Sequence, residues 1–400
     1  MDADVIVVGG AVAGGAVANA FGSLGVRTLL VEKVEREVHS TRGDLLHPPT
    51  LALLDRWGVL ADLHADGALP IDKLAVSHSR RGRIAEFPTA AVDDGPAGRT
   101  LAVPHDRIEA VLYECALSWP SVSAQRGVVT GVVRDANGRV DGVRVRTHGA
   151  NDETELQAKL VVGCDGSQSM VRRALGISAQ PEQYDHEQII IGGEGPTELP
   201  AALHWYLDEI GRVCVVSRPR GGFRILLTLP LGERGDLLRL PDPALHEYLV
   251  GRFPALTPLR FRKTDAHLYR LFRQVADRFW APGVALVGDS AHTTHPAGAT
   301  GMSLAISDAA RLADRVAPLL LAGAPSDKID SALSAYDEER RPAALAAVEA
   351  NHLQALRLWQ SDLFLEPDAY AQAVDPAGNW GAGGAGWGAD PGALAFTGRG

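Results

Sequence analysis

Short apolar runs and small-residue helical segments alternate at the start of this chain. Val5–Val8 is wholly apolar, which is typical of a buried strand, and Ala11–Leu24 carries the small apolar residues of a tightly packed helix. A second strand, Arg27–Val31, ends at Glu32. These segments predict a β-α-β unit of about thirty residues.

Two amphipathic helices and a pair of strands are predicted next. Pro49–Leu63 and Asp106–Leu117 have apolar residues spaced along one helical face. Val128–Val133 and Val140–Val145 predict a β-hairpin, and the Asn-Gly pair between them suits a type I′ turn.

Farther along, the pattern becomes rich in strands. Leu160–Val162 and Val284–Val287 predict short buried strands. Between them, four apolar runs predict a separate antiparallel sheet. These runs are Ile189–Ile191, Leu203–Tyr206, Val213–Val216 and Phe223–Leu229.

The last third of the chain is predicted to be helical. Gly301–Leu321 is rich in Ala and Leu, and Ser326 is a candidate N-cap for a second helix to about Leu363. Pro342 should kink or split that helix. After Glu366 the composition becomes Gly-rich, which predicts a flexible tail.

Composition narrows the class of protein. The chain has 400 residues, 46% of them hydrophobic, so it can bury a large core, and its net charge of −10 argues against a nucleic-acid partner. Cys115, Cys164 and Cys214 are too few and too far apart for a disulfide framework or a zinc site, which fits a reducing cytosol. Asp2 and Asp4 precede the first apolar run, where a signal peptide needs basic residues. We expect a cytoplasmic protein with no membrane span and no bound metal, and we leave a homodimer open.

The segment 5–14 (VIVVGGAVAG) resembles the turn that binds an adenine dinucleotide. Gly9 permits the tight turn from strand to helix, and Gly14 lets the helix pack closely on the strand. A pyrophosphate would then lie at the positive end of the helix. Glu32 follows at the distance where a carboxylate can bind a ribose 2′-hydroxyl, which favours FAD or NAD over NADP. Ala11 replaces the middle glycine. The alternative is a buried β-α-β unit whose glycines bind nothing.

Two further motifs follow in a fixed order. They are VVGCDGSQSMVR at 161–172 and VGDSAH at 287–292, the latter running into PAGATG at 296–301. Together with the first motif they resemble class A flavoprotein monooxygenases, the p-hydroxybenzoate hydroxylase-like family. The resemblance implies that Asp165 helps to hold FAD, with Ser169 and Arg172 bracing the turn, and that Asp289 bonds a ribityl hydroxyl. Where the family often has Gly-Gln-Gly-x-Asn, this chain has ATGMS at 299–303.

The same resemblance implies a full set of FAD-binding positions. The helix that starts after 296–301 would stabilise negative charge on the reduced flavin through its free N–H groups. The positions expected to bind FAD are Gly9, Ala11, Val12, Ala13, Gly14, Glu32, Lys33, Arg42, Arg107, Asp165, Gly288, Asp289, Gly298, Gly301 and Met302.

The implied fold is α/β. A Rossmann-like FAD-binding domain with three layers (ββα) would comprise residues 1–75, 96–178 and 266–325. An antiparallel substrate-binding sheet, residues 76–95 and 179–265, would be interleaved with it. Residues 326–365 would form C-terminal helices and residues 366–400 the Gly-rich tail.

The implied activity is that of an FAD-dependent monooxygenase. NAD(P)H would reduce FAD, and one oxygen atom from O2 would pass through a C4a-hydroperoxyflavin to an aromatic or polyketide-like small molecule, as in secondary metabolism. Because the chain holds a single dinucleotide fingerprint, NAD(P)H would bind only transiently.

Candidates for the reacting pocket come from loops and strands near the third motif. The resemblance implies that Pro296 lies beside the reacting oxygen. His47, Tyr206 and Arg220 are further candidates for catalysis, and Arg218, Arg224 and His295 for the pocket wall. Each has an ordinary alternative, such as a capped turn for His47, a core position for Tyr206 and solvated strand ends for the arginines.

Two other functions share part of this pattern. A flavin-dependent alkene reductase of the geranylgeranyl reductase type has two of the three motifs, and a non-catalytic flavin-binding protein needs no particular catalytic side chain. The Trp-x-Trp-x-Ile-Pro segment of flavin-dependent halogenases is not found in the sequence.

Overall fold

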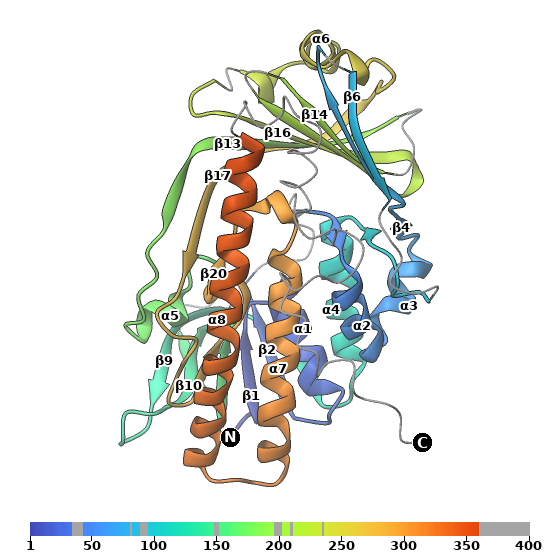
Figure 1. Ribbon diagram of the computed structural model, residues 1–400. Coiled ribbons are helices and arrows are strands. Elements are labelled where there is room, and N and C mark those ends of the chain that lie inside the picture. Colours follow the sequence, from blue (N-terminus) through green and yellow to red (C-terminus); the bar gives the residue numbers. More distant parts are fainter. Residues whose placement is uncertain are drawn as a thin grey trace.

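The computed structural model describes residues 1–33, 43–80, 82–88, 95–147, 152–195, 202–208, 211–233 and 236–359 (Figure 1). The predicted FAD-binding residue Arg42 and the predicted tail, residues 366–400, lie outside the described residues.

A six-stranded sheet forms the centre of the lower half of the molecule. Its strand order is β18-β19-β12-β1-β2-β8, and all neighbours are parallel except β18 and β19. The strands are β1 (Val5–Val8), β2 (Thr28–Glu32), β8 (Val122–Arg126), β12 (Leu160–Gly163), β18 (Trp280–Ala281) and β19 (Val284–Leu286). The carboxyl ends of β1, β2, β12 and β19 therefore lie along one edge.

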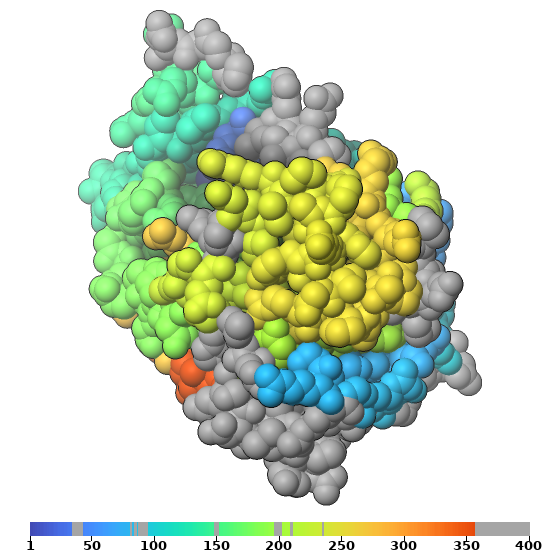
Figure 2. Space-filling view, turned by 90° about the horizontal axis from the view of Figure 1, so that it is seen from above, coloured from blue at the N-terminus to red at the C-terminus, as the bar shows by residue number. Residues whose placement is uncertain are grey.

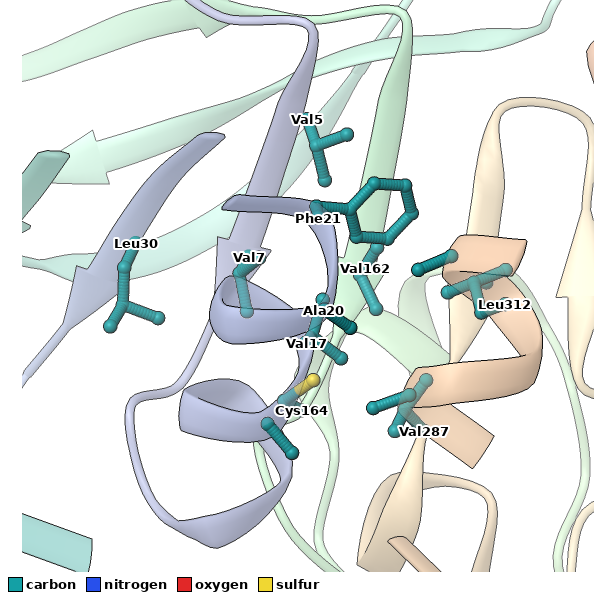
Figure 3. Close-up of a cluster of buried hydrophobic side chains, with 14 of the residues drawn as sticks. Val5, Val7, Val17, Ala20, Phe21, Leu30, Val162, Cys164, Val287 and Leu312 are labelled. Atoms are coloured by element: carbon teal, nitrogen blue, oxygen red, sulfur yellow. The ribbon is translucent and has the colours of Figure 1, made fainter. Parts of the chain in front are cut away.

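Layers of helices and strands cover this sheet. Helix α1 (Val12–Gly22) contacts both α4 (His105–Ser118) and α7 (Gly301–Leu321). An antiparallel sheet of β9 (Val128–Arg134), β10 (Val140–Arg146) and β11 (Glu153–Gln157) contacts β2 and β12. Figure 3 shows side chains from β1, α1, β2, β12 and α7 meeting in one apolar core. The predicted three-layer α/β fold is confirmed.

An eight-stranded sheet lies above the first (Figure 1). Its order is β20-β17-β13-β16-β15-β14-β5-β6, and all neighbours are antiparallel except β14 and β5. The strands are β5 (Lys73–His78), β6 (Gly82–Pro88), β13 (Glu182–Glu194), β14 (Leu203–Leu207), β15 (Arg212–Ser217), β16 (Gly222–Pro230), β17 (Arg262–Val275) and β20 (His292–Thr293). Strand β17 crosses the predicted domain boundary at 265/266, so that boundary does not separate the two sheets.

Helix α6 (Asp242–Arg252) covers the outer face of the eight-stranded sheet, as the view from above in Figure 2 shows in yellow. Residues of both faces are buried: strand β15, for example, is buried at every position.

The remaining elements connect or brace the two halves. They are β3 (Leu45–Leu46), β4 (Leu69–Pro70), β7 (Leu101–Ala102), α2 (Pro48–Arg56), α3 (Val59–Ala65), α5 (Met170–Ala174), α8 (Ser326–Trp359) and the 3-10 turns η1 (Pro219–Gly221), η2 (Leu237–Arg239), η3 (Pro254–Leu256), η4 (Gly288–Ser290) and η5 (Pro296–Gly298). With 34 residues, α8 is about 50 Å long and runs from the base of the molecule to the upper sheet (Figure 1).

Two predicted helices differ from the structure. The predicted helix 49–63 is two helices, because Gly58 adopts a left-handed conformation with φ of +78° between α2 and α3. Pro342 does not split α8. Proline has no N–H group, so the Glu338 carbonyl, four residues earlier, lacks its helical hydrogen bond. Because both residues are exposed, water can bond to that carbonyl.

The turn between β9 and β10 also differs. Gly138 has φ of +81°, but Asn137 does not have the positive φ that a type I′ turn requires. The strands are instead joined by a loop longer than a two-residue turn. In this loop the Asp135 carboxylate accepts hydrogen bonds from the N–H groups of Asn137 and Arg139 at 2.8 and 3.0 Å.

Within the part of the chain that is described, no helix combines the length and the apolar character needed to cross a bilayer.

Candidate functional site

The three sequence motifs meet at the carboxyl ends of neighbouring strands. The backbone N–H of Cys164 donates to the Val8 carbonyl at 2.8 Å, which ties the second motif to the first. The carbonyl of Gly163 accepts from Ser290 Oγ at 2.6 Å and from the Val287 N–H at 3.0 Å, which ties the third motif to the second.

The turn after β1 leaves no room for side chains. Gly9 has φ of +100°, and a Cβ there would lie 2.5 Å from the Cys164 carbonyl oxygen. A Cβ on Gly14 would lie 1.7 Å from the Gly9 carbonyl oxygen. The helix that follows has no side-chain cap at Ala11 and no acidic residue in its first turn. This arrangement offers bare backbone N–H groups and the positive end of α1 to an anion such as a pyrophosphate.

Glu32 lies at the end of β2, beside this turn. Its Oε2 accepts a hydrogen bond from the Gly10 N–H. The carboxylate is thus close to the start of α1, where a ribose bound to the same turn would lie. Lys33 is exposed.

The second motif is held by its own aspartate. The carboxylate of Asp165 accepts hydrogen bonds from the Ser169 hydroxyl and from the N–H groups of Met170, at 2.7 Å, and Val171, at 3.0 Å. These bonds cap α5. Asp165 therefore shapes the turn, and its neighbours Gly166 and Ser167 line the cavity described below.

Arg172 joins the second motif to the third, in agreement with its predicted bracing role. Its guanidinium donates to the carbonyls of Ser167 at 2.8 Å and Ser290 at 2.7 Å.

A buried ionic cluster that the sequence did not reveal supports the third motif. Asp308 of α7 is fully buried and contacts His292 Nε2 at 2.6 Å, Arg340 Nε at 2.8 Å and the Gly288 N–H at 3.3 Å. Burial would raise the pKa of Asp308, but His292 and Arg340 outweigh it and the pKa is lowered. The only signal in the sequence is a charged residue on the apolar face of 301–321.

Hydrogen bonds from a residue of α8 hold the loop that precedes α7. The Gly298 N–H donates to Asn351 Oδ1 at 3.0 Å, and Asn351 Nδ2 donates to Thr300 Oγ1 at 2.8 Å. Ala299 adopts φ of +53° between them. Helix α7 then begins without a side-chain cap or an acidic residue in its first turn. A second uncapped helix N-terminus therefore faces the same region as that of α1.

A cavity of about 320 Å³ lies between these loops and the eight-stranded sheet. Nine of the predicted site residues line it: Ala11, Val12, Ala13, Arg224, Asp289, His295, Pro296, Gly301 and Met302. Residues from one face of strands β13, β14, β15 and β16 line the opposite wall. The turn after β1, the carboxylates of Glu32 and Asp289 and the uncapped starts of α1 and α7 are groups that could hold an adenine dinucleotide.

Two predicted catalytic residues do not reach this cavity. Tyr206 faces the other side of the sheet, where it belongs to the same apolar cluster as Ile189 and Phe223, and burial raises its pKa to about 12. Arg220 is exposed in the η1 turn with φ of 60°. The structure corrects both expectations.

Two other candidates, His47 and Arg107, do not line the cavity. His47 is buried against the Gly298 backbone and 3.3 Å from Thr100 Oγ1, and burial lowers its pKa to about 4. Arg107 is half-exposed and pairs with Asp66 at 2.5 Å, which raises its pKa.

Arg218 and Arg224 bind the same buried carboxylate. Nε of Arg218 is 2.9 Å and Nε of Arg224 is 3.2 Å from Asp44 Oδ2. Arg224 also lines the cavity and lies 3.4 Å from Asp265. This cluster ties the chain after β2 to the eight-stranded sheet.

Two buried histidines line the cavity next to Pro296. His295 Nδ1 accepts the Ala297 N–H at 3.0 Å, so the neutral ring carries its proton on Nε2, which lies 3.1 Å from His186 Nε2. His186 Nδ1 in turn contacts Asp185 at 2.8 Å. Burial, together with the charges of His186 and His352, lowers the pKa of His295 to about 3.

We expect His295 to make the fold sensitive to mild acid. Its folded pKa is about 3 and its ordinary value is 6.5, so below pH 6.5 the unfolded chain takes up a proton that the folded chain does not. Stability should therefore fall as pH falls, by up to about 1.4 kcal/mol per pH unit for this residue. Urea unfolding at pH 7 and pH 5 should show a smaller loss for His295→Asn than for the wild type. The control is His64→Asn, on the surface of α3; equal losses in wild type and His295→Asn would contradict the prediction.

Comparison with known proteins finds one matching family model and several similar monooxygenases. A protein-family model described as FAD binding domain matches residues 2–351. The chain is similar to para-nitrophenol 4-monooxygenase of Pseudomonas sp. (strain WBC-3), with 25% identity covering 84% of this chain and 82% of the relative. It is also similar to 6-methylpretetramide 4-monooxygenase of Streptomyces rimosus, with 28% identity covering 93% and 87%. The crystal structure of P. aeruginosa PqsL in complex with 2-aminobenzoylacetate superposes with a TM-score of 0.77 and 26% identity, covering 93% of this chain and 99% of that one.

Proposed function

Since this chain belongs to the FAD-binding family of class A flavoprotein monooxygenases, we propose that it uses NAD(P)H and O2 to insert one oxygen atom into an aromatic or polyketide-like small molecule. The observation that carries the proposal is the cavity that joins the N-termini of α1 and α7 to the eight-stranded sheet.

The residues around this cavity divide into a cofactor side and a substrate side. On the cofactor side, Glu32 would bind the ribose, the start of α1 the pyrophosphate, and Asp289 the ribityl chain. FAD would supply the redox chemistry, accepting hydride from NAD(P)H and activating O2. The start of α7 would hold negative charge on the reduced ring.

On the substrate side, the chain excludes water and orients the ring to be oxidised. The sheet wall carries Ile190, Trp205 and Leu226, and Pro296 lies on the opposite, cofactor side. A largely apolar chamber keeps water from the reacting atoms. The single dinucleotide turn supports transient rather than permanent binding of NAD(P)H.

A direct experiment separates this function from the alternatives. The purified protein should be yellow and should oxidise NADH or NADPH in air, and an aromatic product made under 18O2 should contain one labelled atom. Saturation of an alkene without O2 would favour a reductase instead. A yellow protein inert toward both nicotinamides would be a flavin-binding module, and a colourless protein that does not take up FAD would contradict the proposal.

Asp289→Ala should yield mostly apoprotein. Loss of a charged hydrogen-bond partner costs about 1.5–3 kcal/mol, which corresponds to a roughly 10- to 150-fold weaker affinity for FAD. The measurement is the FAD-to-protein absorbance ratio after desalting, followed by titration with FAD. Asp327→Ala, which removes an exposed carboxylate at the start of α8, is the matched control. Full FAD retention by Asp289→Ala would show that this carboxylate does not hold the cofactor.

A further inference from the structure

Pairing of the strands arranges the sheet wall of the cavity in rows. Gln188 of β13 is directly opposite Tyr269 of β17 on one side and Thr228 of β16 on the other. Thr228 is in turn opposite Arg212 of β15. All four side chains line the cavity, so one polar row crosses four strands.

The neighbouring row on the same face is apolar. Two residues farther along β13 lies Ile190, opposite Leu226, which is followed across the sheet by Cys214 and Trp205. These four also line the cavity. Because two residues of a strand span about 7 Å, the two rows are separated by about the width of an aromatic ring.

Gln188 has an incomplete set of hydrogen bonds. Its Nε2 lies 3.2 Å from Thr228 Oγ1, while its Oε1 has no hydrogen-bond partner among the described residues. The residue is 3% exposed, so bulk water does not satisfy this atom. A buried polar group without a partner calls for an explanation, and Gln188 also lines the cavity, where a bound ligand could supply the partner.

The position of Gln188 Oε1 limits which chemical groups can be its missing hydrogen-bond partner. Because Gln188 Oε1 is a hydrogen-bond acceptor that faces the cavity, its missing partner is a hydrogen-bond donor on the ligand. A hydroxyl meets this requirement, and it can bond the terminal amide of Gln188 in either orientation, because it both donates and accepts.

We propose that Gln188 binds a hydroxyl group of the aromatic substrate while the ring lies on the apolar row. This rests on the proposed function and names a residue of this chain that would position the substrate on the sheet wall. Gln188 then acts as a specificity-determining residue, because a site built to hydrogen-bond a hydroxyl discriminates strongly against an analogue that cannot fill that role.

The test compares matched pairs of ligands that differ only in this group. Calorimetry on the holoenzyme would measure the affinity for 4-nitrophenol and 4-nitroanisole, 2-naphthol and 2-methoxynaphthalene, and 1-hydroxyanthraquinone and 1-methoxyanthraquinone. In the pair whose size suits the cavity, we expect the wild type to bind the hydroxy member roughly 10- to 100-fold more tightly. Gln188→Met, which keeps the length of the side chain, should reduce this ratio to about threefold or less. Gln183→Met, an exposed position on the same strand, should leave the ratio unchanged.

The outcomes separate this inference from the proposed function. A Gln188→Met ratio equal to that of the wild type, or a wild type that prefers no hydroxy member, would overturn the inference, even if the protein holds FAD and consumes NAD(P)H. A protein that prefers hydroxy ligands through Gln188 but consumes no NAD(P)H would keep the binding site and overturn the proposed function.

Discussion

Asp308→Ala is expected to destabilise the fold by about 3–5 kcal/mol and to abolish FAD retention. The change leaves the guanidinium of Arg340 buried without its 2.8 Å partner, and an unpaired buried charge costs about this much. It also removes the acceptor for His292 and for the Gly288 N–H, which hold the third motif. Urea unfolding and the flavin absorbance of the purified variant measure the two effects.

The matched control for this change lies on the same helix. Asp314 forms a 3.1 Å ion pair with Arg56 at the surface, so Asp314→Ala should cost less than about 1 kcal/mol and keep FAD. Equal effects of the two substitutions would show that the buried cluster does not support the third motif.

Acidification should remove part of the stability that the ionised Asp308 carboxylate gives to the wild-type protein. Because the pKa of Asp308 is lowered in the fold, its contribution to stability is present above the ordinary value of 3.8 and is lost as pH falls through the lower, folded value. Asp308→Asn should lack this component of acid unfolding.

Gly14→Ala is expected to give an unstable protein without FAD. Its methyl group would lie 1.7 Å from the Gly9 carbonyl oxygen, which belongs to backbone and cannot rotate away. Extra methylene groups in packed cores usually cost about 1–3 kcal/mol, and a collision with backbone at this distance should exceed that range. Thermal unfolding and FAD content after purification are the measurements.

Gly251→Ala is the matched control for Gly14. Gly251 lies in α6, and a Cβ there has no atom within 4 Å. Alanine should stabilise this position slightly, because glycine is the poorer helix former. Normal stability and FAD content in Gly14→Ala would contradict the assignment of the first motif.

Much of the fold could be predicted because its central strands are short apolar runs bounded by glycines. Val5–Val8, Leu160–Val162 and Val284–Val287 were each predicted and observed within a residue or two. The break at Gly58 was missed, since the apolar spacing of helices α2 and α3 continues across it and only the left-handed φ interrupts the helix.

The cofactor side of the site was easier to predict than the substrate side. Cofactor motifs are local in sequence, so neighbouring residues are enough to nominate Ala11 and Asp289, and both line the cavity. Strands β14 and β15 of the eight-stranded sheet are buried on both faces, so they show no alternation to reveal which face lines the cavity. The sequence therefore points to Tyr206 although its neighbour Trp205 lines the cavity, and only the strand register places Gln188 in the polar row.

Helix α8 has a consequence for how the protein matures. Asn351, near the end of α8, forms hydrogen bonds with Gly298 and Thr300 in the loop on one side of the cavity. Residues 11–13, which follow β1, line another part of the same cavity. A ribosome must therefore release nearly all of the described chain before the two walls can close on each other. We therefore expect flavin insertion to follow the synthesis of α8, and a nascent chain stalled before α8 should emerge colourless even where FAD is abundant.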